Sequence, residues 1–269
     1  MIMKEIVLRE DKPEVVLKAY ISDDSGHVRD AILVIPGGGY SCVCDDREGE
    51  PIALAYLSRG YHAFVLKYSV GADAVFPEPL IDVSLAVAYM KSHAEEFHIA
   101  PERIFAVGFS AGGHLCAMLG TMWNHESIYE KTNIKFGENK ITGMILCYPV
   151  ISGKDGALDQ ESFCNLNGTE TPTKEQLAFL SLENQVSEET VPAFIMHTAA
   201  DEMVPVINAI YFTEALAKNH IKFELHIYPN GPHGMALATP VTSGGNLKFE
   251  NKRIARWVDD SCAWIEENF

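Results

Sequence analysis

The stretch Val107-Gly108-Phe109-Ser110-Ala111-Gly112-Gly113-His114-Leu115 decides the fold, because it passes from an apolar run into a serine surrounded by glycines. The apolar run, residues 104–107, favours a strand, and the residues after the serine favour a helix. Gly108 and Gly112 match the pattern G-x-S-x-G, in which small residues let the backbone turn sharply and present the serine hydroxyl. The same five residues also describe an ordinary turn, so their meaning depends on the rest of the chain.

Apolar runs alternate with amphipathic segments on both sides of this serine. Asp23, Asp24, Ser25 and Gly26 provide turn chemistry between two early runs. The alternation predicts an α/β protein with a mostly parallel central sheet and helices on both faces. Strands are expected at residues 6–8, 15–21, 31–35, 61–68, 104–109, 141–147, 193–197 and 223–228, and helices at 51–58, 82–93, 210–218 and 248–267.

Length and composition favour one domain over residues 1–269, because 47% hydrophobic residues suffice for a large core. Two polar segments, residues 123–140 and 152–190, are too long for ordinary connections. Long loops in a domain of this kind either serve function or are surface excursions. We expect these two to be lid or substrate-wall insertions, with the surface excursion as the alternative.

The charge balance restricts the partners. The chain has 37 Asp and Glu against 21 Lys and Arg, and its net charge of -16 disfavours binding to nucleic acid or to an anionic membrane surface. No apolar stretch approaches the roughly 20 residues that span a bilayer. The first six residues show no secretory signal pattern, which predicts a cytoplasmic protein. A homo-oligomer is compatible with this composition.

The six cysteines are scattered, which favours thiols over a disulfide framework. Cys42 and Cys44 are a close pair, but without a second pair they are a weak metal or redox candidate. The glycine loop at residues 36–40 matches neither G-x-G-x-x-G nor G-x-x-x-x-G-K-[ST], which disfavours a nucleotide site. We therefore expect no metal and no cofactor.

A nucleophilic serine needs a base and an acid, which follow it in the order Ser, Asp or Glu, His in doubly wound hydrolases. His233 lies in a turn after the last expected strand, and Asp201 lies just past the strand at 193–197. Loops at the carboxyl ends of strands are where α/β sheets bind ligands. Glu202 is the alternative acid and His197 the rival base. His114, four residues after Ser110, is expected to pack or cap the helix.

Acyl transfer also needs donors for the oxyanion. The backbone N–H of Ala111, next after the serine, is one candidate. One or two more are expected from Pro36-Gly37-Gly38-Gly39, which follows the strand at 31–35. Three glycines let the main chain approach a substrate closely, although a flexible turn would account for one of them.

With these motifs, the chain resembles the α/β-hydrolase superfamily over nearly its whole length. Within it, the chain is similar to the acetylxylan-esterase-like group of carbohydrate esterases, near the hormone-sensitive-lipase type. The residues that carry the likeness are the glycine loop 36–40, the serine turn 108–115, Asp201 with Val204-Pro205, and Gly231-Pro232-His233-Gly234.

The resemblance implies a catalytic triad of Ser110, Asp201 and His233, and oxyanion donors at Gly38, Gly39 and Ala111. The chain has Pro36 where the H-G-G-G loop of lipases has histidine, which favours a sugar ester over a lipid.

The implied function is removal of acetyl or other short acyl groups from carbohydrate, such as acetylated xylo-oligosaccharides, through a serine acyl-enzyme. Two further enzymes share this chemistry: a general short-chain carboxylesterase and a prolyl-oligopeptidase-type peptidase. A catalytically silent binding protein with the hydrolase fold is the alternative outside enzymes.

Overall fold

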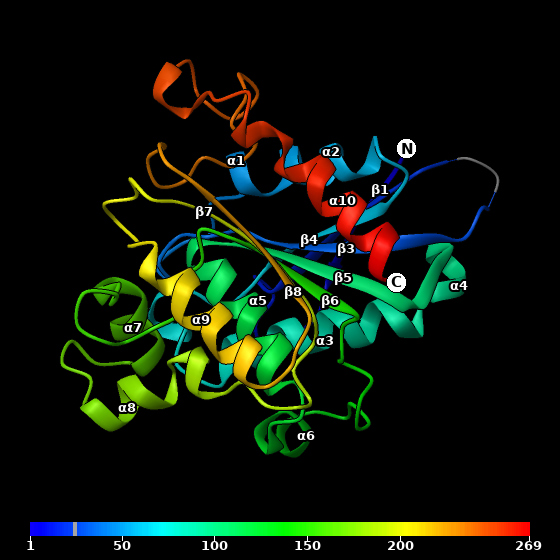
Figure 1. The fold of residues 1–269 in the computed structure, drawn as a ribbon. Coiled ribbons are helices and arrows are strands. Elements are labelled where there is room, and N and C mark those ends of the chain that lie inside the picture. The colour runs from blue at the N-terminus through cyan, green and yellow to red at the C-terminus, as the bar shows by residue number, and fades with distance from the viewer. Residues whose placement is uncertain (24–25) are drawn as a thin grey trace.

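An eight-stranded sheet forms the centre of the computed structural model, which describes residues 1–23 and 26–269 (Figure 1). The strands are β1 (Ile2–Val7), β2 (Val16–Ile21), β3 (Arg29–Ile35), β4 (His62–Lys67), β5 (Ile99–Phe109), β6 (Gly143–Cys147), β7 (Ala193–Thr198) and β8 (Phe223–Tyr228). Their order across the sheet is β1-β2-β4-β3-β5-β6-β7-β8. All pairs from β4 to β8 are parallel, and β1 and β2 join as an antiparallel edge.

Helices cover both faces of this sheet (Figure 1). The α-helices are α1 (Asp45–Glu48), α2 (Glu50–Leu57), α3 (Glu78–Ser92), α4 (Ala94–Phe97), α5 (Ser110–Met122), α6 (Glu126–Lys131), α7 (Gln160–Asn167), α8 (Lys174–Phe179), α9 (Ile207–Lys218) and α10 (Trp257–Asn268). Short 3-10 turns are η1 (Gly71–Asp73), η2 (Leu182–Asn184), η3 (Leu247–Phe249) and η4 (Ile254–Arg256). None of the helices in the described part of the chain is long and apolar enough to span a bilayer.

The inner parts of the central strands, such as residues 31–35 of β3 and 104–109 of β5, are apolar because both of their faces are buried. Side chains of a strand alternate between the two faces, so β3 supplies two separate cores. Leu33 and Ile35 join the core under α3 and α5. Ile32 and Val34 join the core under α2 and α10. This arrangement explains why the sequence shows an unbroken apolar run there and not an alternating one.

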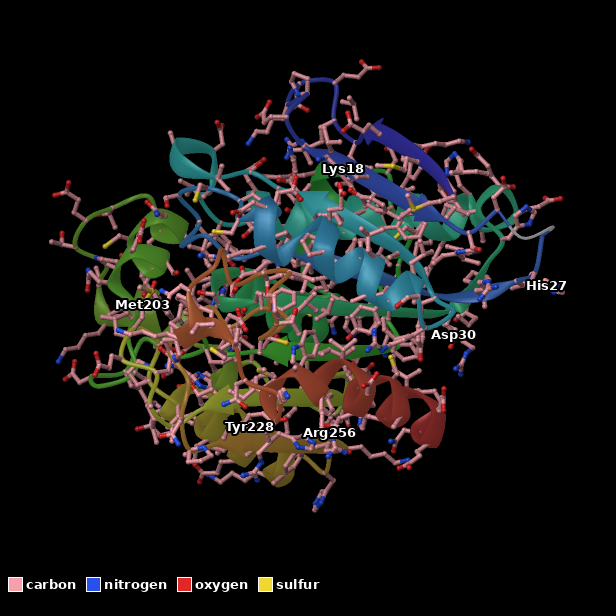
Figure 2. The ribbon with its side chains drawn as sticks, turned by 90° about the horizontal axis from the view of Figure 1, so that it is seen from above. Lys18, His27, Asp30, Met203, Tyr228 and Arg256 are labelled. Carbon is pink, nitrogen blue, oxygen red and sulfur yellow. The ribbon has the colours of Figure 1, made fainter. Side chains whose placement is uncertain are left out.

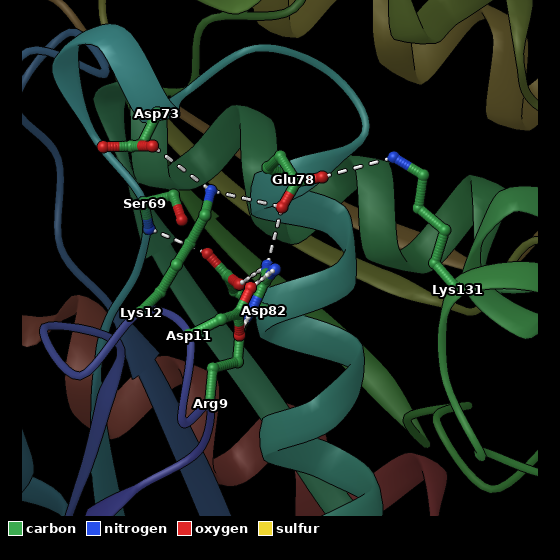
Figure 3. Close-up of polar contacts among 8 residues, drawn as sticks. All are labelled: Arg9, Asp11, Lys12, Ser69, Asp73, Glu78, Asp82 and Lys131. Carbon is green, nitrogen blue, oxygen red and sulfur yellow. Dashed lines mark hydrogen bonds and ion pairs between the residues drawn. The ribbon is translucent and has the colours of Figure 1, made fainter.

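An ion-pair cluster attaches the antiparallel edge to helix α3 (Figure 3). Arg9, just after β1, donates from Nη1 to Oε2 of Glu78 at 2.7 Å and to Oδ1 of Asp82 at 3.0 Å. The other carboxylate oxygen of Asp82 accepts the backbone N–H of Ser69 at 2.8 Å. The Asp82 side chain is fully buried, so these bonds compensate a charge that water does not reach.

The expected strands and helices are present, with two differences in extent. The strand expected at residues 6–8 is β1, Ile2–Val7, and overlaps the expectation by two residues only. The helix expected over residues 248–267 begins only at Trp257. Before it, the side chain of Asn251 accepts the backbone N–H groups of Arg253 and Ile254, which stabilises a turn where a helix was expected. In the early turn, Asp24 and Ser25 lie outside the described residues.

The two long polar segments lie at opposite ends of the sheet. Residues 123–140 connect the end of α5 to the start of β6 and contain α6, so they lie at the amino ends of the parallel strands. Residues 152–190 follow the carboxyl end of β6 and contain α7, α8 and η2. Only the second segment is therefore placed beside the carboxyl ends of the strands.

Candidate active site

Ser110 occupies the sharp corner between β5 and α5. Its backbone φ is 53°, in the left-handed region that a side chain disfavours, so the corner is strained. A Cβ on Gly108 would lie 2.3 Å from the carbonyl oxygen of Gly112. One on Gly112 would lie 2.2 Å from the carbonyl oxygen of Pro36. The two glycines of the motif are therefore required by close backbone contacts.

Three of the predicted residues form one hydrogen-bonded chain. Nε2 of His233 lies 2.8 Å from Oγ of Ser110, and Nδ1 of His233 lies 2.7 Å from Oδ2 of Asp201. Because a carboxylate only accepts, the proton of the neutral imidazole is on Nδ1, and Nε2 accepts from the serine hydroxyl. This arrangement allows the serine proton to pass to Nε2.

The strands bring these residues together across the sequence. Asp201 follows the carboxyl end of β7 and His233 follows that of β8, and these two strands are parallel neighbours. The hydroxyl of Thr198 donates to the carbonyl oxygen of Gly231 at 2.7 Å and ties the two loops to each other. The serine, the acid and the imidazole thus share the end of the sheet where α/β proteins bind ligands.

The alternative residues are placed elsewhere. Glu202 is exposed, and the carboxylate that meets His233 belongs to Asp201. His197 is buried in β7, where its Nδ1 accepts the N–H of Thr198, and burial lowers its pKa to about 4.

His114 bridges the hydroxyl of Tyr40 and the carbonyl oxygen of Leu180, at 3.0 and 2.9 Å. His114 therefore packs the helix, as expected, and also anchors the segment 152–190.

The glycine loop after β3 lines the same pocket as the serine. The N–H of Gly37 points inward and donates to Oε2 of Glu48 at 2.8 Å. No hydrogen bond within the described residues uses the N–H of Gly38 or Gly39, and both glycines line the pocket that contains Ser110. Ala111 is the second residue of α5, in the first turn, where N–H groups have no acceptor in the helix itself. These three groups are available to an oxyanion.

A pocket of about 210 Å³ opens over Ser110 and His233. Figure 2 shows one of its lining residues, Met203, at the end of the molecule near α7 and α8, opposite the end with His27 and Asp30. The other lining residues are mostly polar or charged: Gly38, Gly39, Ser41, Cys42, Cys44, Arg47, Glu48, Asp159 and Glu161. A larger groove of about 500 Å³ lies beside Arg9 and α3 and shares none of these residues.

Two charged side chains at the mouth of this pocket form no ion pair within the described residues, although Arg47 lies near the carboxylate of Glu48. Arg47 forms no ion pair with any described residue, and its guanidinium lies 3.7 Å from Sγ of Cys44. Glu161 is exposed, accepts no hydrogen bond from the described residues, and packs against Gly39. Neither residue stands in a motif of the sequence, although Glu161 lies within the segment 152–190 that is expected to form a lid or substrate wall.

The Cys42 and Cys44 pair lies at the edge of the pocket with both thiols free. Burial raises the pKa of the Cys44 thiol to about 11, so Cys44 stays protonated at neutral pH. The described residues contain no group of three or more His, Cys, Asp or Glu side chains placed to hold a metal ion.

Comparison with known proteins places these features in a family. A family model described as BD-FAE matches residues 17–216, more than half of the chain, and one for the dienelactone hydrolase family matches residues 180–258. Endo-1,4-beta-xylanase B of Butyrivibrio fibrisolvens is 37% identical over 252 residues, which cover 90% of this chain and 38% of that protein. An acetylxylan esterase of Xylanibacter ruminicola is 32% identical over 213 residues, 78% of this chain and 42% of that protein. The chain thus spans less than half the length of these curated relatives.

A solved structure is similar over almost its whole length. The acetyl ester-xyloside bifunctional hydrolase from Caldicellulosiruptor lactoaceticus is 33% identical, with a TM-score of 0.82 over 98% of this chain and 96% of that one. From the family match and these structural neighbours, we conclude that the chain belongs to the BD-FAE family and has the α/β-hydrolase fold.

Proposed function

We propose that this protein is a serine esterase that removes acetyl or similarly short acyl groups from carbohydrate, with acetylated xylo-oligosaccharides as the model substrate. The observation that carries the proposal is the hydrogen-bonded chain Ser110, His233 and Asp201 beside the unused N–H groups of Gly38 and Gly39. The names of the xylanase, acetylxylan esterase and acetyl ester-xyloside hydrolase relatives support the substrate class.

The reaction proceeds by two acyl transfers. Oγ of Ser110 attacks the ester carbonyl carbon while its proton moves to Nε2 of His233, and the carbonyl oxygen becomes an oxyanion. The bond to the sugar oxygen then breaks, and His233 returns the proton to that oxygen. Water repeats the sequence on the acyl-serine, releases the acid and restores the hydroxyl. Asp201 stabilises the imidazolium that forms in each half.

The oxyanion lies where Gly38, Gly39 and Ala111 direct their N–H groups. Fixed donors stabilise the developing charge without reorganising, and each is worth about 3 kcal/mol of transition-state stabilisation. Because these groups are unused in the resting protein, binding the oxyanion breaks no existing hydrogen bond.

The pocket also supports a small acyl group on a polyhydroxylated alcohol. A space of about 210 Å³ suits an acetyl group better than a long chain. Arg47 and Glu161 at its mouth are a donor and an acceptor that form no ion pair within the described residues, and sugar hydroxyls satisfy both kinds of group. A hydrocarbon chain offers neither kind of partner.

The test is labelling with a fluorophosphonate, followed by acetate release. Purified protein is expected to carry the probe on Ser110, and Ser110→Ala is expected to lose both labelling and turnover of p-nitrophenyl acetate by several orders of magnitude. A wild-type protein that neither labels nor turns over any ester indicates a binding protein. Labelling with activity on simple aryl esters only indicates a general carboxylesterase.

A further inference from the structure

We propose that Glu48 and Tyr148 form a buried bridge that positions the oxyanion loop and the His233 loop relative to each other. The proposal rests on the serine esterase function above. It assigns both side chains as positioning residues, because neither touches the reacting atoms. We call this pair the Glu48–Tyr148 bridge.

The bridge joins three segments by hydrogen bonds. Oε2 of Glu48 accepts the N–H of Gly37 at 2.8 Å, and Oε1 accepts the hydroxyl of Tyr148 at 2.9 Å. The same hydroxyl oxygen accepts the N–H of Ala236 at 2.9 Å. Gly37 precedes the two glycines that face the oxyanion, and Ala236 lies three residues after His233. The two catalytic loops are thus connected through two side chains.

Every polar atom of the bridge has a defined role. The Tyr148 oxygen accepts from Ala236, which leaves its own hydrogen free to donate to Glu48. Both carboxylate oxygens of Glu48 accept, and no water is needed to complete them. A satisfied buried network is rigid, since each broken bond leaves an unpaired group. The inward direction of the Gly37 N–H therefore holds the following peptide turned toward the pocket.

Steric contacts restrict the same region. Glu48 and Tyr148 are 2% and 1% exposed, so neither side chain has room to move. Tyr148 has a backbone φ of 39°, a strained value that the surrounding contacts maintain. Its ring meets the imidazole of His233 edge-on, with centroids 5.1 Å apart. The bridge therefore supports His233 through the ring as well as through Ala236.

Charge gives the bridge a second effect on His233. A carboxylate behind the site favours the imidazolium that forms during acyl transfer, as Asp201 does from the other side. Burial raises the pKa of Glu48, while its two hydrogen bonds and the positive charges of Arg47 and protonated His233 oppose that rise. Cys44, Tyr68, Cys147 and Tyr148 are the other titratable groups near this carboxylate.

The test compares Tyr148→Phe with a matched control, Tyr56→Phe. Tyr56 is also fully buried and its hydroxyl pairs with Ser261 at 2.8 Å, but it bonds to neither catalytic loop. With p-nitrophenyl acetate, Tyr148→Phe is expected to lower kcat by about 10-fold to 100-fold with KM within about twofold, because only transition-state alignment is lost. The rate of fluorophosphonate labelling is expected to fall in parallel. Tyr56→Phe is expected to leave all three unchanged.

Glu48→Gln provides an independent variant, since the amide keeps the size of the side chain and removes its charge. It is expected to lower kcat, and the double variant Glu48→Gln with Tyr148→Phe is expected to lose less than the product of the two single losses. Full kcat in both single variants, or a change in KM alone, would overturn the bridge. A wild-type protein without turnover or labelling would overturn the esterase proposal instead, so the two failures are distinguishable.

Discussion

Asp201 holds the imidazole of His233 through one carboxylate oxygen, while the backbone holds the other. Oδ2 lies 2.7 Å from Nδ1 of His233, and Oδ1 accepts the N–H groups of Met203 and Val204 at 3.0 and 2.9 Å. The side chain of Asp201 is fully buried. The direction of the carboxylate, and with it the tautomer of His233, is therefore fixed by the loop after β7.

Asp201→Asn is expected to lower kcat by about 10⁴-fold, because an amide nitrogen facing Nδ1 favours the wrong tautomer of the base. The matched control is Glu202→Gln, which removes a neighbouring exposed carboxylate and is expected to keep full activity. Initial rates with p-nitrophenyl acetate measure both. A large loss of activity in Glu202→Gln together with an active Asp201→Asn would contradict the assignment of the triad acid to Asp201.

Gly38→Ala is expected to lower kcat at least about 100-fold, because the loop has no room for a methyl group and an oxyanion donor moves. Gly38 has a φ of 129°, and its Cβ would lie 2.2 Å from the carbonyl oxygen of Cys42. Gly137→Ala is the control, since Gly137 also has a positive φ of 85° but nothing lies within 4 Å of its Cβ position. Equal rates in the two variants, at equal melting temperature, would remove Gly38 from the oxyanion site.

His114 predicts an acid-sensitive fold. Burial lowers the pKa of His114 from 6.5 to about 4, against opposing effects of the Leu180 carbonyl and Asp159. The unfolded chain then binds the proton more tightly, so this stability is complete above about pH 6.5 and is lost as the pH falls toward 4. Between pH 7 and 4.5 the loss is about 2 to 3 kcal/mol.

The variant that isolates this effect is His114→Gln, whose amide can replace both hydrogen bonds but does not titrate. Denaturant unfolding at pH 7 and 4.5 is expected to show a smaller loss of unfolding free energy in the variant than in the wild type. His197, with a similarly lowered pKa, is present in both proteins and cancels in the comparison. Identical losses would show that His114 does not cause the acid sensitivity.

Two carboxylates, those of Asp82 and Asp11, pair with the guanidinium of Arg9. We expect their removal to change the free energy of unfolding by very different amounts. Asp82→Asn is expected to destabilise the fold by about 3 to 5 kcal/mol, because the buried Arg9 contact and the Ser69 N–H cannot both be satisfied by an amide. Asp11 also pairs with Arg9, at 2.9 Å, but its side chain is 69% exposed. Asp11→Asn is expected to unfold like the wild type, and urea titration of both variants measures the contrast.

The sequence predicted the fold well because the fold depends on apolar runs. The inner residues of β3, β5, β6 and β7 are buried on both faces and appear as continuous hydrophobic segments, and the α/β-hydrolase fold they imply is confirmed. The start of α10 was predicted wrongly, because Asn251 stabilises a local turn with its side chain. That competition depends on geometry and leaves no apolar pattern.

The predicted site residues Ser110, Asp201 and His233 could be found from turns that follow strands, a feature of sequence order. Glu48 could not, because Asp45-Asp46-Arg47-Glu48 looks like a solvated charged turn. In the folded chain it is buried and bonds to Tyr148, which is 100 residues away in the sequence. Arg47 and Glu161 meet at the pocket only after the loops from β3 and β6 come together.

The most direct test of the account is release of acetate from acetylated xylo-oligosaccharides by the wild-type protein and by Ser110→Ala, with the products identified by mass. The account predicts deacetylated oligosaccharide and free acetate with the wild type, a transient increase in protein mass equal to one acetyl group on Ser110, and neither with the variant. Intact acetylated oligosaccharide after prolonged incubation with a wild-type protein that hydrolyses p-nitrophenyl acetate would contradict the carbohydrate substrate.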